Sequence, residues 1–266
     1  MNLPVVLITG AAQRIGRAIA LHLATQNWRV AVHYRRSAEE AGETVATIVA
    51  SGGAARAFAA DLADESQCEC LVPAVRQAFG RIDAVVHNAS LFEHDDVASF
   101  SYAAMDRHWR TNTAAAVVLG RALHQALAHQ PALADRPGGS VLVNLLDQKL
   151  WNPNPDHVSY TLYKAALQAA TTLLAQALAP QVRVCGVAPG VTLLSGDMTE
   201  IEFTAAHRMT PLQRSSSAED IAQAVAYLLN AGAVTGTTLL VDGGQHLTAQ
   251  PRDVMFLARR AVEEDK

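Results

Sequence analysis

The stretch L-P-V-V-L-I-T-G-A-A-Q-R-I-G, Leu3–Gly16, decides the fold. Its first seven residues are mostly apolar and branched, which is typical of a buried strand. The turn Gly10–Gly16 follows, and a helix is expected from about Arg14 to Gln26. A strand that enters a helix through such a turn presents backbone N–H groups and the helix dipole, which suit a pyrophosphate. The spacing G-x5-G, with Ala12 in place of a third glycine, departs from G-x-G-x-x-G.

The alternation of short apolar runs and helical patterns continues along the chain and indicates repeated βα units. Further strands are expected at 28–34, 55–60, 83–88, 140–146, 182–188 and within 237–244. Helices are expected at 38–51, through 72–79, and at 103–129, 160–179 and 218–230. No composition shift divides this series. The sequence therefore predicts an α/β fold: a single doubly wound Rossmann-type domain over residues 1–266, with a mostly parallel seven-stranded sheet and a C-terminal tail from about 247 to 266.

The composition argues against several classes of binding partner. Half of the 266 residues are apolar and 17% are charged, which suits helices packed on a buried sheet. The net charge of −4 argues against a nucleic-acid groove or an anionic membrane surface. The sequence shows no membrane span or signal-peptide pattern, and its three cysteines form no zinc-binding pattern. We therefore expect a cytoplasmic protein with no nucleic-acid partner, no membrane partner and no metal.

The end of the second expected strand indicates which dinucleotide binds. An acidic residue there would bind a ribose 2′-hydroxyl and repel a 2′-phosphate. No carboxylate occurs before Glu39, and two arginines and a serine suit a phosphate instead. The sequence therefore predicts NADPH, the alternative being a solvated basic turn. The expected contacts are His33, Tyr34, Arg35, Arg36 and Ser37.

A possible acid–base pair lies in a strongly helical run. Tyr160 and Lys164 are four residues apart, so both side chains project from one face of the expected helix. An ammonium group beside a phenol favours phenolate and would lower the tyrosine pKa. Asp147 stands thirteen residues before Tyr160, at the end of a buried strand. A surface tyrosine with a solvated lysine is the alternative interpretation of the pair alone.

Several motifs occur together over nearly the whole chain: T-G-x3-R-x-G, Asp61-Leu62, Asn88-Ala89-Ser90, Asn112, Tyr160-x3-Lys164 and Pro189-Gly190. In this order they resemble the short-chain dehydrogenase/reductase family. The position of that family's usual catalytic serine holds Asp147, and with Arg14 in the glycine loop this resembles the pteridine and dihydromonapterin reductases. Further matches to these enzymes are H-Y-R-R-S, N-A-S-L-F and T-P-L-Q-R-S-S-S-A-E-D.

The resemblance implies a role for each motif. Lys164 would hold the nicotinamide ribose and lower the pKa of Tyr160, and Asn112 would belong to a proton-relay water site. Phe92 would stack on the pterin ring opposite the nicotinamide. The implied catalytic residues are Asp147, Tyr160, Lys164 and Asn112. The implied substrate contacts are Arg14, Ser90, Phe92, Asp147 and Tyr160. Besides the basic turn, the cofactor-binding residues are Gly10, Arg14, Ile15, Gly16, Asp61, Leu62, Asn88, Ala89, Ser90, Lys164, Pro189 and Gly190.

The implied reaction is hydride transfer from NADPH to a C=N bond of a dihydropterin of the biopterin, monapterin or folate type. Tyr160 and Asp147 would supply the proton. One alternative is a generic NADPH-dependent ketone or quinone reductase in which Asp147 is a drifted serine. A second alternative is a non-catalytic dinucleotide sensor. Enoyl reductases of this fold usually have six residues between the tyrosine and the lysine. Three residues lie between Tyr160 and Lys164 in this chain, which argues against enoyl reduction.

Other parts of the chain give weaker signals. The resemblance suggests a homotetramer, with the segment 244–256 packed near a neighbour's substrate pocket. The segment 191–209 should contact the pterin side chain, but it carries no readable motif. Trp151 and His157 lie between Asp147 and Tyr160, so either could line the pocket.

Overall fold

Seven parallel strands form one sheet in the computed structural model, which describes residues 3–130 and 138–264. The order β3-β2-β1-β4-β5-β6-β7 reverses direction between β1 and β4, and every pairing in the described sheet is parallel. The predicted α/β fold with seven strands is confirmed. The strands are β1 Val5–Ile8, β2 Arg29–Tyr34, β3 Ala55–Ala59, β4 Ala84–His87, β5 Ser140–Leu145, β6 Val182–Pro189 and β7 Thr238–Val241.

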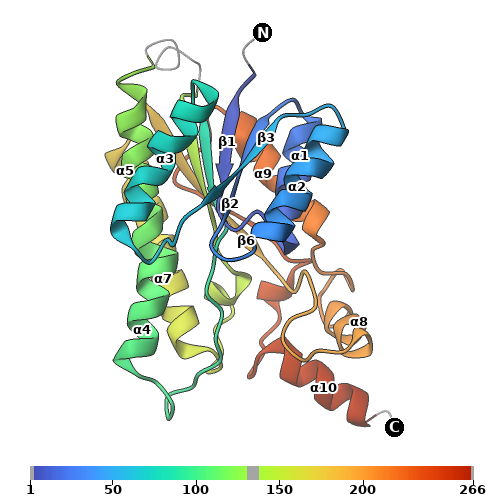
Figure 1. Cartoon of the computed structure of the whole chain (residues 1–266). Helices are drawn as coiled ribbons and strands as arrows, with labels where there is room; N and C mark the ends of the chain where they lie inside the picture. The colour runs from blue at the N-terminus through green and yellow to red at the C-terminus, as the bar shows by residue number, and fades with distance from the viewer. Residues whose placement is uncertain (1–2, 131–137, 265–266) are drawn as a thin grey trace.

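Helices cover both faces of the sheet (Figure 1). One face carries α1 Arg14–Thr25, α2 Ala38–Ala50 and α9 Ala218–Asn230, and the other carries α3 Glu65–Phe79, α5 Ala115–Leu127 and α7 Val158–Ala177. The remaining elements are α4 Tyr102–His108, α8 Glu200–Arg208, α10 Val254–Glu264 and the 3₁₀ turns η2 Gln148–Leu150 and η3 Gln245–Leu247. No described helix combines the length and apolar character needed to cross a membrane.

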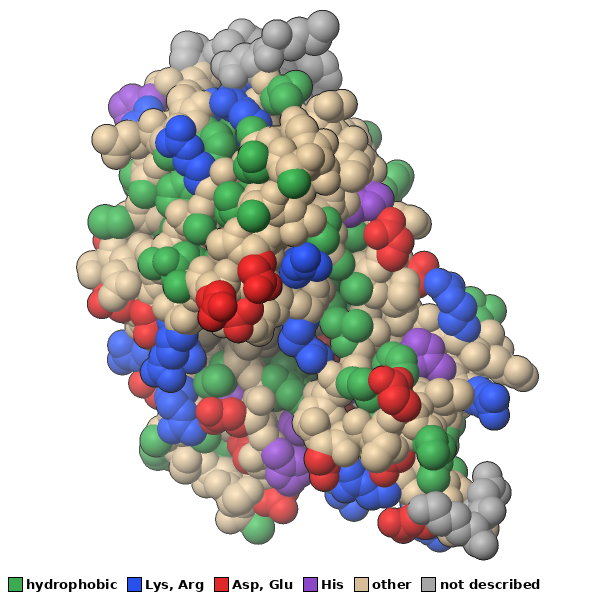
Figure 2. Space-filling model, turned by 45° about the vertical axis from the view of Figure 1, so that its right-hand side comes forward, with side chains coloured by type: hydrophobic (Ala, Val, Ile, Leu, Met, Phe, Trp, Pro, Cys, Tyr) green, Lys and Arg blue, Asp and Glu red, His purple; other side chains and the backbone are tan. Residues whose placement is uncertain are grey.

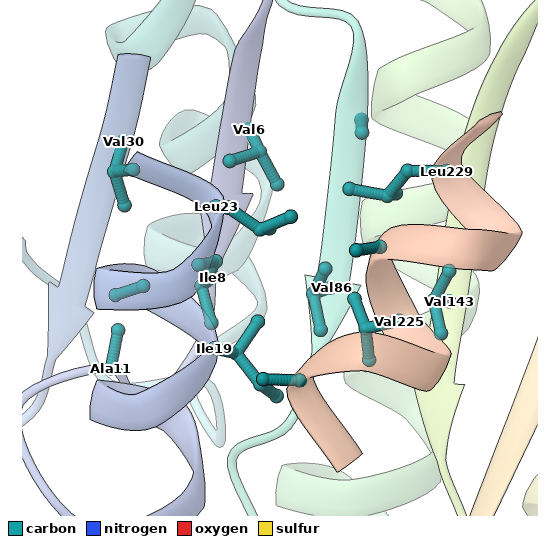
Figure 3. Close-up of a cluster of buried hydrophobic side chains, with 14 of the residues drawn as sticks. Val6, Ile8, Ala11, Ile19, Leu23, Val30, Val86, Val143, Val225 and Leu229 are labelled. Carbon is teal, nitrogen blue, oxygen red and sulfur yellow. The ribbon is translucent and has the colours of Figure 1, made fainter. Parts of the chain in front are cut away.

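The core consists of two apolar layers, one on each face of the sheet. Alternate residues of β1 point to opposite faces, so Val6 and Ile8 join one layer while Val5 and Leu7 join the other. Burial on both faces explains why the central strand β1 is continuously apolar. Figure 3 shows the first layer, in which side chains of the central strands pack against Ile19, Leu23, Val225 and Leu229 of α1 and α9.

The single helix expected over 103–129 is interrupted. Between α4 and α5 the chain forms a π-helical turn, η1 Trp109–Ala114. This turn buries Asn112, which exchanges hydrogen bonds with the backbone of Leu91, and Thr113, which donates to the Tyr163 carbonyl. π turns are often found at functional sites. Helical periodicity alone could not reveal the turn, because its polar partners lie on distant segments.

The segment after β6 is more regular than expected. Helix α8 begins with a capping box in which Thr199 accepts from the Glu202 N–H and Glu202 accepts from the Thr199 N–H. The pattern T-x-x-E was present in the sequence as a signal for this helix start.

The C-terminal tail forms α10, which packs on α8 through Ala206, Val254 and Ala258. Ion pairs join Arg259 to Glu202 at 3.0 Å and to Asp197 at 2.9 Å. Figure 1 shows the two helices side by side below the sheet, at the lower right. The expected tail therefore packs against its own chain, and its last two residues lie outside the described range.

Candidate active site

A cavity of about 630 Å³ lies along the carboxyl ends of the strands. In open parallel sheets, ligands bind at this edge, where the strand order reverses. Figure 2 shows the surface hollowed between the body of the molecule and the lobe that carries the C-terminus. Most of the predicted site residues line the cavity: Gly10, Arg14, Ile15, Gly16, His33, Arg35, Asp61, Leu62, Asn88, Ala89, Ser90, Phe92, Asp147, Tyr160, Lys164, Pro189 and Gly190.

The glycine loop forms a close-packed turn between β1 and α1. A Cβ atom on Gly16 would lie 2.2 Å from the Gly10 carbonyl oxygen, so no other residue fits without moving the backbone. Gly10 itself has φ +63°, a conformation that favours glycine. Among the described residues, Gln13 makes no side-chain capping bond to α1. The first N–H groups of this helix therefore suit an anionic ligand.

His33 supports the glycine loop from β2. Its Nδ1 accepts the Gly10 N–H at 3.0 Å, so the ring proton is on Nε2, which donates to the Ala60 carbonyl at 3.1 Å. Burial lowers the pKa of His33 to about 4, which keeps the ring neutral at physiological pH. Asn88 holds the same turn from β4 by donating to the carbonyls of Thr9 and Gly10.

The basic turn after β2 is only partly inside the cavity. Arg35 lines it, whereas the predicted contacts Tyr34, Arg36 and Ser37 are not among the lining residues. Arg14 approaches from the glycine loop with φ +53°, a strained conformation for a non-glycine residue. Its guanidinium donates to the Leu194 carbonyl at 2.8 Å, which connects the loop to the segment after β6.

The acid–base candidates meet at the ends of β5 and α7. The Tyr160 hydroxyl donates to Oδ2 of Asp147 at 2.6 Å, and Oδ1 of Asp147 accepts the Lys149 N–H at 2.9 Å. One helical turn from Tyr160, the Lys164 ammonium donates to the Leu145 carbonyl at 2.6 Å and lies 5.6 Å from the Tyr160 ring centroid. The structure thus brings the three side chains together as the sequence predicted.

The pKa of Tyr160 differs from the one expected from the sequence, whereas that of Asp147 is shifted in the expected direction. Burial and the adjacent Asp147 carboxylate raise the pKa of Tyr160 well above its usual value, so the prediction that Lys164 lowers it is wrong for the free chain. Burial raises the pKa of Asp147, as expected, although the bond from Tyr160 opposes this. Burial also lowers the pKa of Lys164 to about 8. At neutral pH, Tyr160 is therefore a phenol that can donate a proton.

Phe92 lies at the cavity with its side chain about half exposed. Its ring stacks on His157 at 4.4 Å between centroids and meets the edge of Tyr160 at 4.6 Å. His157 also lines the cavity, which the sequence had left open, while Trp151 is not among the lining residues. Asn112 does not line the cavity either, because its amide is held against the backbone of Leu91, directly before Phe92.

Residues of the C-terminal tail form a wall of this chain's own cavity. No motif in the sequence pointed to them, because they reach the site through packing against distant parts of the chain, among them the segment between Asp147 and Tyr160. Two ion pairs join the tail to that segment, Lys149–Asp253 at 3.4 Å and Asp156–Arg252 at 2.8 Å. The residues after β7 that line the cavity are Gln245, Gln250, Asp253, Val254 and Met255.

Comparisons with known proteins agree with this architecture. A family model described as Enoyl-(Acyl carrier protein) reductase matches residues 10–246. Pteridine reductase 1 of Leishmania tarentolae is 34% identical, over 92% of this chain and 97% of its own. A ketoacyl reductase assigned to the granaticin polyketide synthase of Streptomyces violaceoruber is also 34% identical, over 92% of this chain and 96% of its own.

Among solved structures, the FolM alternative dihydrofolate reductase 1 of Brucella canis, complexed with NADP, superposes with a TM-score of 0.84. It is 37% identical, and the match covers 93% of this chain and 96% of that one. The fold, the motifs and these matches lead to one conclusion: the chain belongs to the short-chain dehydrogenase/reductase family and is an NADP-dependent oxidoreductase.

Proposed function

We propose that this enzyme uses NADPH to reduce a C=N bond of a dihydropterin. The observation that carries the proposal is the hydrogen bond of 2.6 Å from the Tyr160 hydroxyl to Asp147, which stands where the family usually has a serine. A buried carboxyl group with a raised pKa can pass a proton to a ring nitrogen, which a serine hydroxyl does far less readily. The similarity to a pteridine reductase and to the Brucella enzyme supports the same substrate class.

The cavity fits the cofactor. Gly10 and Gly16 carry no side chain, and the first turn of α1 carries no acidic residue, so a pyrophosphate can approach the backbone there. Arg35 would bind the 2′-phosphate, and Lys164 would bind the nicotinamide ribose. NADPH supplies the hydride when bound.

The protein's own contribution is the proton. Tyr160 and Lys164 both line the cavity, and the ammonium group of Lys164 donates to the Leu145 carbonyl. Tyr160 would donate its proton as negative charge develops on the substrate nitrogen, and Asp147 would return a proton to it. Lys164, still largely protonated at neutral pH, would stabilise the transient phenolate.

A substrate panel tests the proposal. The purified enzyme should oxidise NADPH when dihydrobiopterin, dihydromonapterin or dihydrofolate is the substrate. The kcat/KM for such a substrate should be well above that for simple ketones. The second candidate is a carbonyl reductase, which the similarity to the granaticin ketoacyl reductase favours. Faster turnover of ketones than of every dihydropterin would select it. NADPH binding without any turnover would instead indicate a dinucleotide sensor.

Phe92→Ala should raise the KM for a dihydropterin several-fold with little change in NADPH affinity. An offset-stacked aromatic contact contributes about 0.5–1.5 kcal/mol beyond area burial. Phe92 offers a half-exposed ring for such a contact, next to Tyr160. Steady-state kinetics and a fluorescence titration with NADPH measure the two quantities. A loss of NADPH affinity alone would identify Phe92 as a packing residue.

Arg36→Asp should shift the cofactor preference from NADPH toward NADH. The introduced carboxylate repels a 2′-phosphate and offers a partner for the ribose 2′-hydroxyl. Because Arg35 lines the cavity and Arg36 does not, Arg35→Asp is the matched variant, and we expect the larger shift there. The ratio of kcat/KM for the two cofactors measures the shift. Unchanged ratios in both variants would contradict phosphate recognition by this turn.

We also propose a homotetramer in solution. Support comes from apolar side chains that are exposed on the two long helices of one face, Val117 on α5 and Leu162 and Leu173 on α7. Exposed apolar side chains on one face are typical of surfaces that bind another protein. Light scattering at micromolar concentration should give the mass of four chains, and a monomeric mass would exclude the proposal.

A further inference from the structure

The tail-formed wall of the cavity contains a pair of charges that the proposed reaction does not use. In the proposed reaction Asp147, Tyr160 and Lys164 have roles, and the arginines of the cavity bind the cofactor. Lys149 and Asp253 remain, and both line the cavity. Their side chains are joined by an ion pair of 3.4 Å between Nζ and Oδ2.

The wall is held in place by polar contacts with the segment between Asp147 and Tyr160. Asp156 accepts from the Asp253 N–H at 2.7 Å and from the Arg252 guanidinium. Asn152 donates to the Thr248 carbonyl at 2.6 Å. Because that segment connects Asp147 to Tyr160, the position of Asp253 is fixed relative to both.

Both charged residues line the cavity, and the carboxylate is the more exposed of the two. The Asp253 side chain is 23% exposed and that of Lys149 only 5%. Oδ1 of Asp253 also accepts the Met255 N–H at 3.1 Å, at the start of α10. A ligand in the cavity would therefore meet the carboxylate first, with the ammonium behind it.

Asp253 is within electrostatic reach of the reacting groups. Burial is the main cause of the raised pKa of Asp147, and the charge of Asp253 adds to it. The same charge contributes to the raised pKa of Tyr160, after burial, Asp147 and Tyr163. It also acts on the imidazole of His157, which stacks on Phe92. A substituent that extends from a substrate at Tyr160 toward the tail thus passes this carboxylate.

We propose that Asp253, held by Lys149, is a specificity-determining residue that disfavours substrates with a carboxylate at this end of the cavity. Two like charges brought together in a partly desolvated site repel each other, and such repulsion is a usual means of rejecting a competing ligand. For the identity of the substrates, the inference rests on the proposed function. Among dihydropterins it favours an uncharged, hydroxylated side chain over the glutamate-bearing side chain of dihydrofolate.

Asp253→Asn tests the inference with dihydrobiopterin and dihydrofolate as paired substrates. The ratio of kcat/KM for dihydrofolate to that for dihydrobiopterin should rise about tenfold, equivalent to ~1.4 kcal/mol, mainly through a lower KM for dihydrofolate. The reason is that Lys149 is left as an uncompensated cation. Asparagine caps a helix as well as aspartate does, so a purely structural role of Asp253 predicts an unchanged ratio. An unchanged ratio overturns the inference.

Arg252→Gln is the matched control. It removes the neighbouring ion pair between the tail and Asp156, but it keeps the Asp253 carboxylate. We expect the two substrates to be affected equally. If Arg252→Gln changes the ratio as much as Asp253→Asn does, docking of the tail and not charge selects the substrate, and the inference is wrong.

The test also separates the inference from the proposed function. If the enzyme reduces ketones but no dihydropterin, the proposed function fails, and the same variants are assayed with a 3-oxo ester and the corresponding 3-oxo acid. Asp253→Asn should again raise the acid-to-ester ratio about tenfold. A ratio equal to that of the parent enzyme overturns the role of Asp253 irrespective of the reaction.

Discussion

Tyr160→Phe is expected to lower kcat for dihydropterin reduction by about 10³-fold, within the usual range for loss of a general acid. The variant keeps the ring that packs edge-on against Phe92 and removes only the hydroxyl that donates to Asp147. NADPH affinity should stay near that of the parent enzyme, because the glycine loop and Lys164 are untouched. Stopped-flow absorbance of NADPH measures the rate directly.

Two controls accompany the tyrosine variant. In this variant the buried Asp147 carboxyl loses its hydrogen bond from Tyr160. Thermal unfolding checks that this loss does not unfold the protein. A fluorescence titration with NADPH checks cofactor binding. A kcat within tenfold of the parent value, with both controls normal, would show that another group supplies the proton.

Asp147→Ala is expected to lower kcat for dihydropterin reduction by about 10²-fold or more. Reduction of a C=N bond develops charge on nitrogen, so an additional acid matters more than in ketone reduction. Asp147→Ser restores a hydroxyl but no titrating group, and should therefore recover ketone reduction better than dihydropterin reduction. Both activities are measured on the same three proteins. Equal dihydropterin turnover by Asp147→Ser and the parent would make the carbonyl reductase the better interpretation.

The pH profile gives a second measurement for Asp147. Its raised pKa means that the proton is retained to higher pH than in an exposed aspartate, and kcat should fall as pH rises through that pKa. Lys164, with a pKa of about 8, loses its charge as pH rises through that value and should cause a separate decrease. In Asp147→Ser the decrease due to Asp147 should be lost, and the one due to Lys164 should move to lower pH, because the charge of Asp147 raises the pKa of Lys164.

From the sequence alone, the fold class could be predicted, as could the glycine loop and the acid–base candidates that line the cavity. Strand–turn–helix repeats and the glycine spacing are local signals, because close packing of Gly16 against Gly10 and burial of both faces of β1 constrain residue types directly. The four-residue separation of Tyr160 and Lys164 likewise fixes a shared helix face. The T-x-x-E signal for the start of α8 is equally local, although no helix was expected there.

Only the tertiary structure decided the protonation of the site and the wall that faces the substrate. The pKa of Tyr160 depends on burial and on an aspartate thirteen residues away, and these outweigh the nearby lysine that the spacing alone made prominent. Asn112 faces Leu91 because of a π turn that satisfies distant polar groups. Asp253 reaches the cavity through contacts with a segment about one hundred residues earlier. Such long-range contacts and the desolvation they cause leave no local pattern in the sequence, so they emerge only when the chain is folded.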